Sequence, residues 1–143
     1  MIIAIGNDHA GVEFKNAIID FFKDKNIEIK NFGTDNENSV DYPDHIHPVA
    51  EFISSKPNSY GIIICGSGNG AAMTANKHKN IRAALCWNED LAKLSRQHND
   101  ANILSIPSRF LSNSEAIEIV DAFIKTDFEG GRHQRRIEKI PCQ

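Results

Sequence analysis

The sequence predicts an α/β fold, in which a single doubly wound domain holds about five parallel strands with helices on both faces. Short continuous apolar runs alternate along the chain with apolar stripes at helical spacing, and parallel strands buried on both faces have such runs. A length of 143 residues suits one domain, and no repeat or low-complexity segment divides the chain. We therefore expect residues 1–143 to form a single domain.

The first half of the chain predicts two strands and two helices. The apolar run of residues 2–5 is the first strand, and residues 27–32 form the second. Between them, the spacing i, i+3, i+4, i+7, i+8 predicts a helix that ends near Asn26, with a stripe formed by Phe14, Ala17, Ile18, Phe21 and Phe22. Pro43 suits the first turn of a second helix, whose stripe is Ile46, Val49, Ala50 and Ile53.

The second half predicts three strands with helices between and after them. Tyr60–Cys65 is the most apolar run of the chain, and a helix through Lys77 should follow its glycine-rich loop. Residues 82–86 and 102–106 are the other two strands, and Asn88 is the expected N-cap of a helix that carries Leu91 and Leu94. Ser112 and Glu115 have capping-box spacing before a last stripe, formed by Ala116, Ile119, Val120 and Phe123.

Composition excludes several classes of protein. A formal net charge of −3 argues against a general nucleic-acid binder, although residues 132–136 are locally basic. No apolar stretch approaches the roughly 20 residues of a membrane span, and the N-terminus lacks a signal-peptide pattern. Three cysteines without paired spacing argue against a disulfide framework. We therefore expect a cytoplasmic protein that binds neither membrane nor nucleic acid.

Ligands of doubly wound folds bind beyond the carboxyl ends of the strands, and a glycine-rich loop, Gly66-Ser67-Gly68-Asn69-Gly70, lies at one such end. Its glycines allow positive φ and close approach, so that backbone N–H groups can converge on a negative oxygen. The loop is equally compatible with a simple strand-to-helix turn. Cys65 before it is either a proton acceptor or a small buried residue that closes the strand, and for Cys86 we expect the second role.

Two histidines lie in polar segments that helix packing does not require. His9 follows Asp8 after the first strand, and His98 lies within residues 95–100. Each could transfer protons near neutral pH or be an ordinary surface histidine. His45 and His47 offer metal-like ligands with nearby aspartates, but His-x-His on a helix directs its side chains apart, so we expect no metal site.

The C-terminal segment places Arg132 and Arg136 four residues apart, on one face of a helix, where two guanidinium groups could hold a phosphate dianion. The alternative is a solvated basic tail. Residues 128–131 look like a shaped turn, which favours docking of about residues 128–143, and a partner subunit is the surface we expect them to dock on.

Taken together, the motifs resemble those of the type B ribose-5-phosphate isomerases and the related galactose-6-phosphate isomerase subunits. The resemblance covers nearly the whole chain and rests on several strings in the same order. They are GNDHAG at 6–11, DYP at 41–43, ICGSGNG at 64–70, ANK at 75–77, SRQHND at 95–100 and GGRHQ at 130–134.

The resemblance implies a Rossmann-like homodimer, or a tetramer, that interconverts D-ribose 5-phosphate and D-ribulose 5-phosphate in the pentose phosphate pathway without a cofactor. It implies that Cys65 is the proton-transferring base and that His98 opens the furanose ring. Some family members without this cysteine use a glutamate just beyond the loop, where this chain has Ala71. It implies that the enediolate is stabilised by the glycine loop, Gly66, Ser67, Gly68, Asn69 and Gly70. The implied sugar contacts are Asp8, Tyr42 and Asn99. The implied phosphate ligands are His9, Arg109, Arg132 and Arg136, some of them supplied by the neighbouring subunit.

Two rival functions stay open from the sequence. An allose-6-phosphate or galactose-6-phosphate isomerase would share the fold, but the galactose enzymes work as two unlike subunits, whereas this chain holds a full set of residues. A nucleotide-binding module built on the glycine loop and Glu89 would be stabilised by nucleotide and would need neither Cys65 nor the C-terminal arginines.

Overall fold

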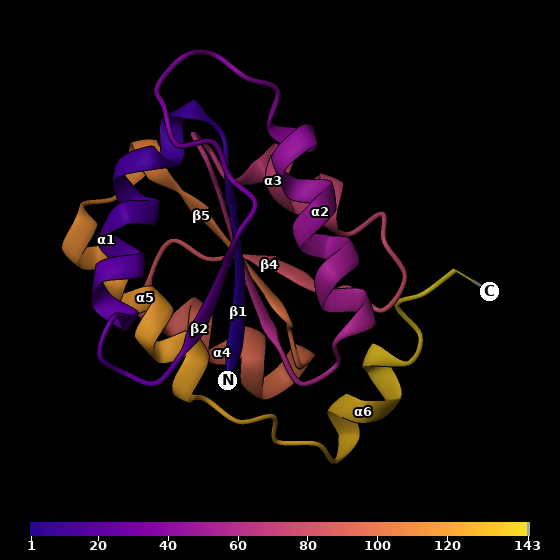
Figure 1. Cartoon of the computed structure of the whole chain (residues 1–143). Coiled ribbons are helices and arrows are strands. Elements are labelled where there is room, and N and C mark those ends of the chain that lie inside the picture. The colour runs from indigo at the N-terminus through magenta and orange to yellow at the C-terminus, as the bar shows by residue number, and fades with distance from the viewer. Residues whose placement is uncertain (143) are drawn as a thin grey trace.

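A parallel sheet of five strands forms the centre of the computed structural model, which describes residues 1–142 (Figure 1). Its order is β2-β1-β3-β5-β4, with the following bounds: β1 Ile2–Asn7, β2 Glu28–Asn31, β3 Tyr60–Cys65, β4 Ala83–Leu85 and β5 Ile103–Pro107. All four strand pairings are parallel. This confirms the predicted strands, whose ends move by one or two residues.

Helices cover both faces of the sheet, as predicted. One face carries α1 (Val12–Phe22), α4 (Glu89–Asn99) and α5 (Asn113–Lys125), and the other carries α2 (Tyr42–Ser55) and α3 (Asn69–Ala75). Each face encloses its own cluster of buried apolar side chains. Because βαβ crossovers are right-handed, the direction in which the chain moves along the sheet decides which face each helix covers. The fold is therefore a doubly wound, Rossmann-like α/β fold.

Three short helices lie outside these layers: the 3₁₀ turns η1 (His9–Gly11) and η2 (Ser108–Phe110), and α6 (Arg132–Ile137). The expected caps are confirmed, since the Asn88 side chain accepts from Leu91 N at 2.9 Å, and Ser112 and Glu115 form a capping box. Two helices end earlier than predicted. α1 stops at Phe22, before a turn to the left-handed Asn26, and α3 stops at Ala75. None of the helices in residues 1–142 is both long and apolar enough to cross a membrane.

Leu94, one of the two leucines that the predicted helix carries, is exposed. The side chains that α4 buries are instead Ala92, Ser95 and Arg96. A buried arginine is tolerated here because carbonyl, carboxylate and hydroxyl oxygens accept hydrogen bonds from its guanidinium group. Hydrophobic spacing alone could not reveal this exchange of an apolar for a charged position.

Candidate active site

The carboxyl ends of β1 and β3 form the point where the strand order reverses, because the chain leaves β1 toward one sheet edge and β3 toward the other. Cys65 is the last residue of β3 and pairs in register with Pro107 of β5. The residue is buried, with 5 % of its surface exposed. Asn7, the last residue of β1, pairs with Ile64. Cys65 therefore lies where doubly wound folds bind their ligands.

Hydrogen bonds hold the glycine loop that follows Cys65. Gly68 takes a φ of +74°, and the Ser105 hydroxyl donates to its carbonyl oxygen at 2.7 Å. The Ser67 hydroxyl accepts from Asn69 N at 3.3 Å, and α3 begins at Asn69. Because β5 holds the loop from below, its amide groups are oriented before any ligand arrives, which is the arrangement that stabilises a developing oxyanion.

Tyr42 and Arg109 lie directly against this loop, although they are distant in sequence. A Cβ atom added at Gly70 would lie 2.5 Å from Cζ of Tyr42, and one added at Gly66 would lie 3.1 Å from Nη1 of Arg109. The Arg109 amide also donates to the Gly66 carbonyl at 3.0 Å. Both predicted ligand residues are thus brought to the loop that follows Cys65.

Asp8 and His9 complete this edge of the sheet. The Asp8 carboxylate caps η1 by accepting from Ala10 N at 3.0 Å, and Nδ1 of His9 accepts from Val40 N at 3.2 Å. We call the whole group the strand-end cluster: Asp8, His9, Tyr42, residues 65–70 and Arg109.

The remaining predicted residues gather around α4 and α6, and we call them the helix cluster: His98, Asn99, Arg132 and Arg136. The imidazole of His98 stacks on that of His133, with ring centroids 4.3 Å apart and planes 15° apart. Glu129 N donates to the Gln97 carbonyl at 3.1 Å, which ties the entry of α6 to α4. Sequence reasoning assigned no role to His133, although this histidine lies within the GGRHQ string at 130–134.

The two clusters lie at opposite ends of the sheet. In the β3–β5 pairing, Cys65 faces Pro107 at one end and Gly61 faces Ile103 at the other. Four residue steps of about 3.3 Å separate these ends by about 13 Å. α4 ends only a few residues before Ile103, and Figure 1 shows α6 at the end of the molecule where the N-terminus lies. Within one chain, Cys65 and His98 therefore do not share a pocket.

The helix cluster is electrically positive. Burial first, and then the neighbouring His98 and Arg132, lower the pKa of His133 below its usual 6.5. Among residues 1–142, His98, Glu129 and His133 are the one group of three side chains that could ligate a metal, with ligand atoms within 4.8 Å of one another. The same positive surroundings disfavour a cation and suit an anion such as phosphate.

The other candidate residues have ordinary surroundings. Nδ1 of His45 lies 3.0 Å from the Phe32 carbonyl, whereas Nδ1 of His47 lies 2.7 Å from Nε2 of His78, so the two side chains point apart as predicted. Burial raises the pKa of the Cys86 thiol to about 11, which suits the structural role expected of it.

Comparison with known proteins gives consistent matches over nearly the whole chain. Residues 3–140 match the family model described as Ribose/Galactose Isomerase. A probable ribose-5-phosphate isomerase B of Mycoplasma pneumoniae is 44% identical over 139 residues, covering 96% of this chain and 91% of that protein. The ribose-5-phosphate isomerase B structure from Clostridium thermocellum has a TM-score of 0.95 and 47% identity, covering 98% of this chain and 95% of that one. The Mycoplasma genitalium enzyme, solved with bound ribulose-5-phosphate, has a TM-score of 0.94 and 45% identity, covering 97% and 93%.

Proposed function

This chain belongs to the ribose/galactose isomerase family, and we propose that it interconverts D-ribose 5-phosphate and D-ribulose 5-phosphate through an enediolate intermediate. The observation that carries the proposal is the position of Cys65, a buried thiol at the switch point of the sheet directly before a preorganised glycine loop. Relatives named for this reaction, one of them solved with ribulose-5-phosphate, support the same substrate.

In the proposed reaction, Cys65 takes the proton from carbon 2 of the open-chain aldose and returns it to carbon 1, while the hydroxyl proton of carbon 2 passes to the oxygen of carbon 1. The charge that develops on the carbonyl oxygen is stabilised by the amides of Gly66–Gly70 and by Ser67. In enzymes, one such preorganised donor contributes about 3 kcal/mol to transition-state stabilisation. Asp8 and Tyr42 hold the sugar hydroxyls, and Asn69 supports the loop through its bond to Ser67.

The phosphate is remote from the reacting carbons, so its binding energy serves to hold the sugar in register. We assign this role to His9 and Arg109 of the strand-end cluster and to Arg132 and Arg136 of the helix cluster. His98 opens the furanose ring before proton transfer, and Asn99 contacts the open-chain sugar. This division gives each cluster only part of the chemistry.

We further propose that the functional unit is a homodimer, from which a tetramer could be built, with sites shared between subunits. A twofold pair in which the strand-end cluster of one copy meets the helix cluster of the other completes two sites at once. Residues 128–143 would then dock on the partner, although Gln143 lies outside the described residues. Exposed Met73 and Trp87, near the edge strand β4, offer apolar surface for such an interface.

The nucleotide-binding alternative rests on the glycine loop and on Glu89, whose carboxylate lies 2.6 Å from Nζ of Lys93 one helical turn further along α4. This alternative assigns no role to His98 or to the arginine pair, Arg132 and Arg136, whereas the isomerase uses them all. The cytoplasm remains the location we propose, because cysteines 65, 86 and 142 are all free thiols.

The deciding experiment measures conversion of ribose 5-phosphate by metal-stripped protein, with allose 6-phosphate in parallel. We expect rapid conversion of the five-carbon sugar. Cys65→Ala should lower the rate by about a thousandfold while phosphate binding stays nearly intact, and Cys86→Ala should retain full activity as the matched control. Turnover of allose 6-phosphate alone would reassign the substrate, and equal losses of binding and activity in Cys65→Ala would remove Cys65 as the base.

A further inference from the structure

The chain makes a sharp turn directly after His98 and Asn99, between α4 and β5. Asp100 takes φ 45° and ψ 44°, a left-handed conformation that few non-glycine residues adopt and that aspartate tolerates better than most. Its amide donates to the Arg96 carbonyl at 3.2 Å, and the amide of Ala101 donates to the Ser95 carbonyl at 3.0 Å. The conformation of Asp100 therefore fixes where α4 ends and how His98 projects from its last turn.

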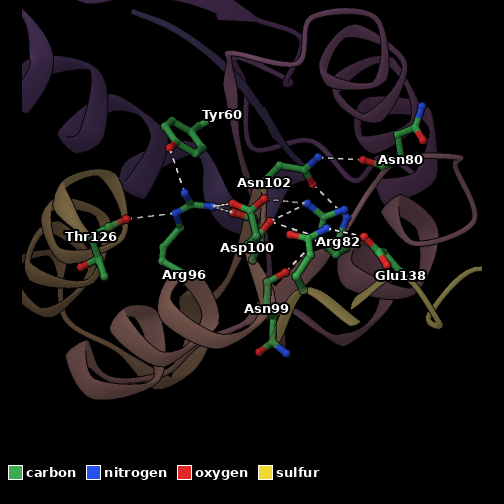
Figure 2. Close-up of polar contacts among 11 residues, drawn as sticks. Tyr60, Asn80, Arg82, Arg96, Asn99, Asp100, Asn102, Thr126 and Glu138 are labelled. Atoms are coloured by element: carbon green, nitrogen blue, oxygen red, sulfur yellow. Dashed lines mark hydrogen bonds and ion pairs between the residues drawn. The ribbon is translucent and has the colours of Figure 1, made fainter. Parts of the chain in front are cut away.

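Arg96 binds this turn from the interior of the molecule (Figure 2). Its Nη1 donates to the Asp100 carboxylate at 2.9 Å and to the Ala101 carbonyl at 2.6 Å. Nε donates to the Thr126 carbonyl at 3.2 Å, and Nη2 donates to the Tyr60 hydroxyl at 3.1 Å. Arg96 is only 5 % exposed. Its bonds to Tyr60 and Thr126 anchor the turn to β3 and to the end of α5.

Arg82 binds the same turn from the opposite side. Its Nε donates to the Asn99 carbonyl at 2.9 Å, and its Nη2 donates to the Asp100 carbonyl at 2.8 Å and to the second carboxylate oxygen at 3.2 Å. Figure 2 shows the Asp100 carboxylate between the two guanidinium groups, while the Asn99 amide points away from them. The last carbonyls of α4 thus receive donors from a side chain that precedes β4.

We propose that Arg82 and Asp100, together with Arg96, are positioning residues for His98. The proposal rests on the proposed function, in which the His98 imidazole must reach the sugar ring in a neighbouring subunit. A side chain that acts across a subunit boundary needs a rigid base, because a misplacement of about 1 Å can lower a rate about a hundredfold. The paired arginines provide this rigidity without contacting substrate.

The test compares four variants of the full-length protein. Asp100→Gly keeps the left-handed backbone conformation accessible but removes the carboxylate. Arg82→Met removes the guanidinium group that binds the turn, while keeping an apolar side chain of similar length. Asp100→Asn keeps one acceptor oxygen and should restore most of the function. Lys93→Met, which breaks a surface ion pair on the same helix far from the turn, is the matched control.

Two rates separate positioning of His98 from general damage. Ribulose 5-phosphate has no free hydroxyl on carbon 5 and stays open-chain, so exchange of its carbon 1 proton with solvent deuterium requires Cys65 but no ring opening. We expect Asp100→Gly and Arg82→Met to lower conversion of ribose 5-phosphate about tenfold or more. The deuterium exchange should fall about threefold or less, and Lys93→Met should change neither rate. Equal losses in both rates would overturn the proposal.

A second readout does not depend on activity. Stacking on His133 shifts the NMR signals of the His98 ring protons through the ring current, so loosening the turn should move these signals toward those of an unstacked imidazole. Unchanged His98 signals in Asp100→Gly and Arg82→Met would overturn the positioning role. If the parent protein converts neither sugar, the proposed function fails, and the NMR comparison still decides whether Arg82 and Asp100 hold His98.

Discussion

At the scale of single residues, the site depends on glycine at Gly68. This residue combines a φ of +74° with a crowded environment, because an added Cβ would lie 2.5 Å from Cδ1 of Leu85 and 3.3 Å from the Ile106 carbonyl carbon. Gly130 has a similar φ of +67° but has no atom within 4 Å of an added Cβ. Comparing substitutions at Gly68 and Gly130 therefore separates the cost of backbone strain from the cost of steric contact.

We expect Gly130→Ala to lower the free energy of unfolding by about 1 kcal/mol, the cost of a left-handed residue with a side chain. Gly68→Ala should lower it by about 3 kcal/mol and also displace the loop amides, so activity should fall with stability. Urea denaturation of both variants checks the difference. Equal losses would mean that the loop relaxes around the new methyl group.

At the scale of elements, the loop of residues 32–41 and the short helix α6 bring distant residues to the two clusters. Lys15, fully buried on α1, donates to the Thr34 carbonyl and pairs with the Asp35 carboxylate, which fixes the loop near His9. α6 is held by buried Ile137 and by the contact of His133 with His98. Neither element has enough length to be stable alone, so each depends on its anchor.

The lowered pKa of His133 predicts how the docking of α6 responds to pH. Between the usual value of 6.5 and the lowered folded value, the unfolded chain binds a proton that the folded protein does not. The stability that this group contributes is thus complete above about pH 6.5 and is lost as the pH falls below it.

Urea denaturation of the native protein and of His133→Gln, between pH 5 and 8, measures this contribution. The native protein should lose more stability than the variant over the acidic half of this range, and amide exchange in residues 129–137 should speed up there. Identical pH slopes for both proteins would contradict the prediction.

At the scale of the whole molecule, the distance between the clusters predicts that inactive variants complement one another. In a dimer of Cys65→Ala with His98→Asn, a shared site takes Cys65 from one copy and His98 from the other. One of the two sites is then intact and the other carries both changes. Random pairing of co-expressed variants makes half of the dimers mixed, so about one quarter of the native activity should return.

The control co-expresses Cys65→Ala with Cys65→Ser, which cannot form an intact site in any pairing. If the mixture of Cys65→Ala with His98→Asn is dimeric but regains no activity, each site lies within one chain. The clusters would then have to approach one another by a change of conformation.

The sequence by itself determined the elements and most of the candidate residues. Continuous apolar runs identify the central strands β1, β3 and β5, which are buried on both faces, and the caps at Asn88 and Ser112 are local hydrogen bonds that neighbouring residues dictate. The glycine loop could also be located from the sequence, because its glycines directly follow the most apolar run of the chain. The resemblance of the motifs then identified the family, which the comparisons confirm.

Only the tertiary structure decided which residues meet. Strand order depends on crossovers whose direction no local pattern encodes, so the sequence did not show that the switch point lies between β1 and β3, beside Cys65. The same holds for buried Arg96 and Lys15, which hydrophobic spacing assigns to the surface, because their burial is compensated by oxygen atoms from distant segments. Local interactions fix elements, whereas long-range packing and hydrogen bonding fix the site.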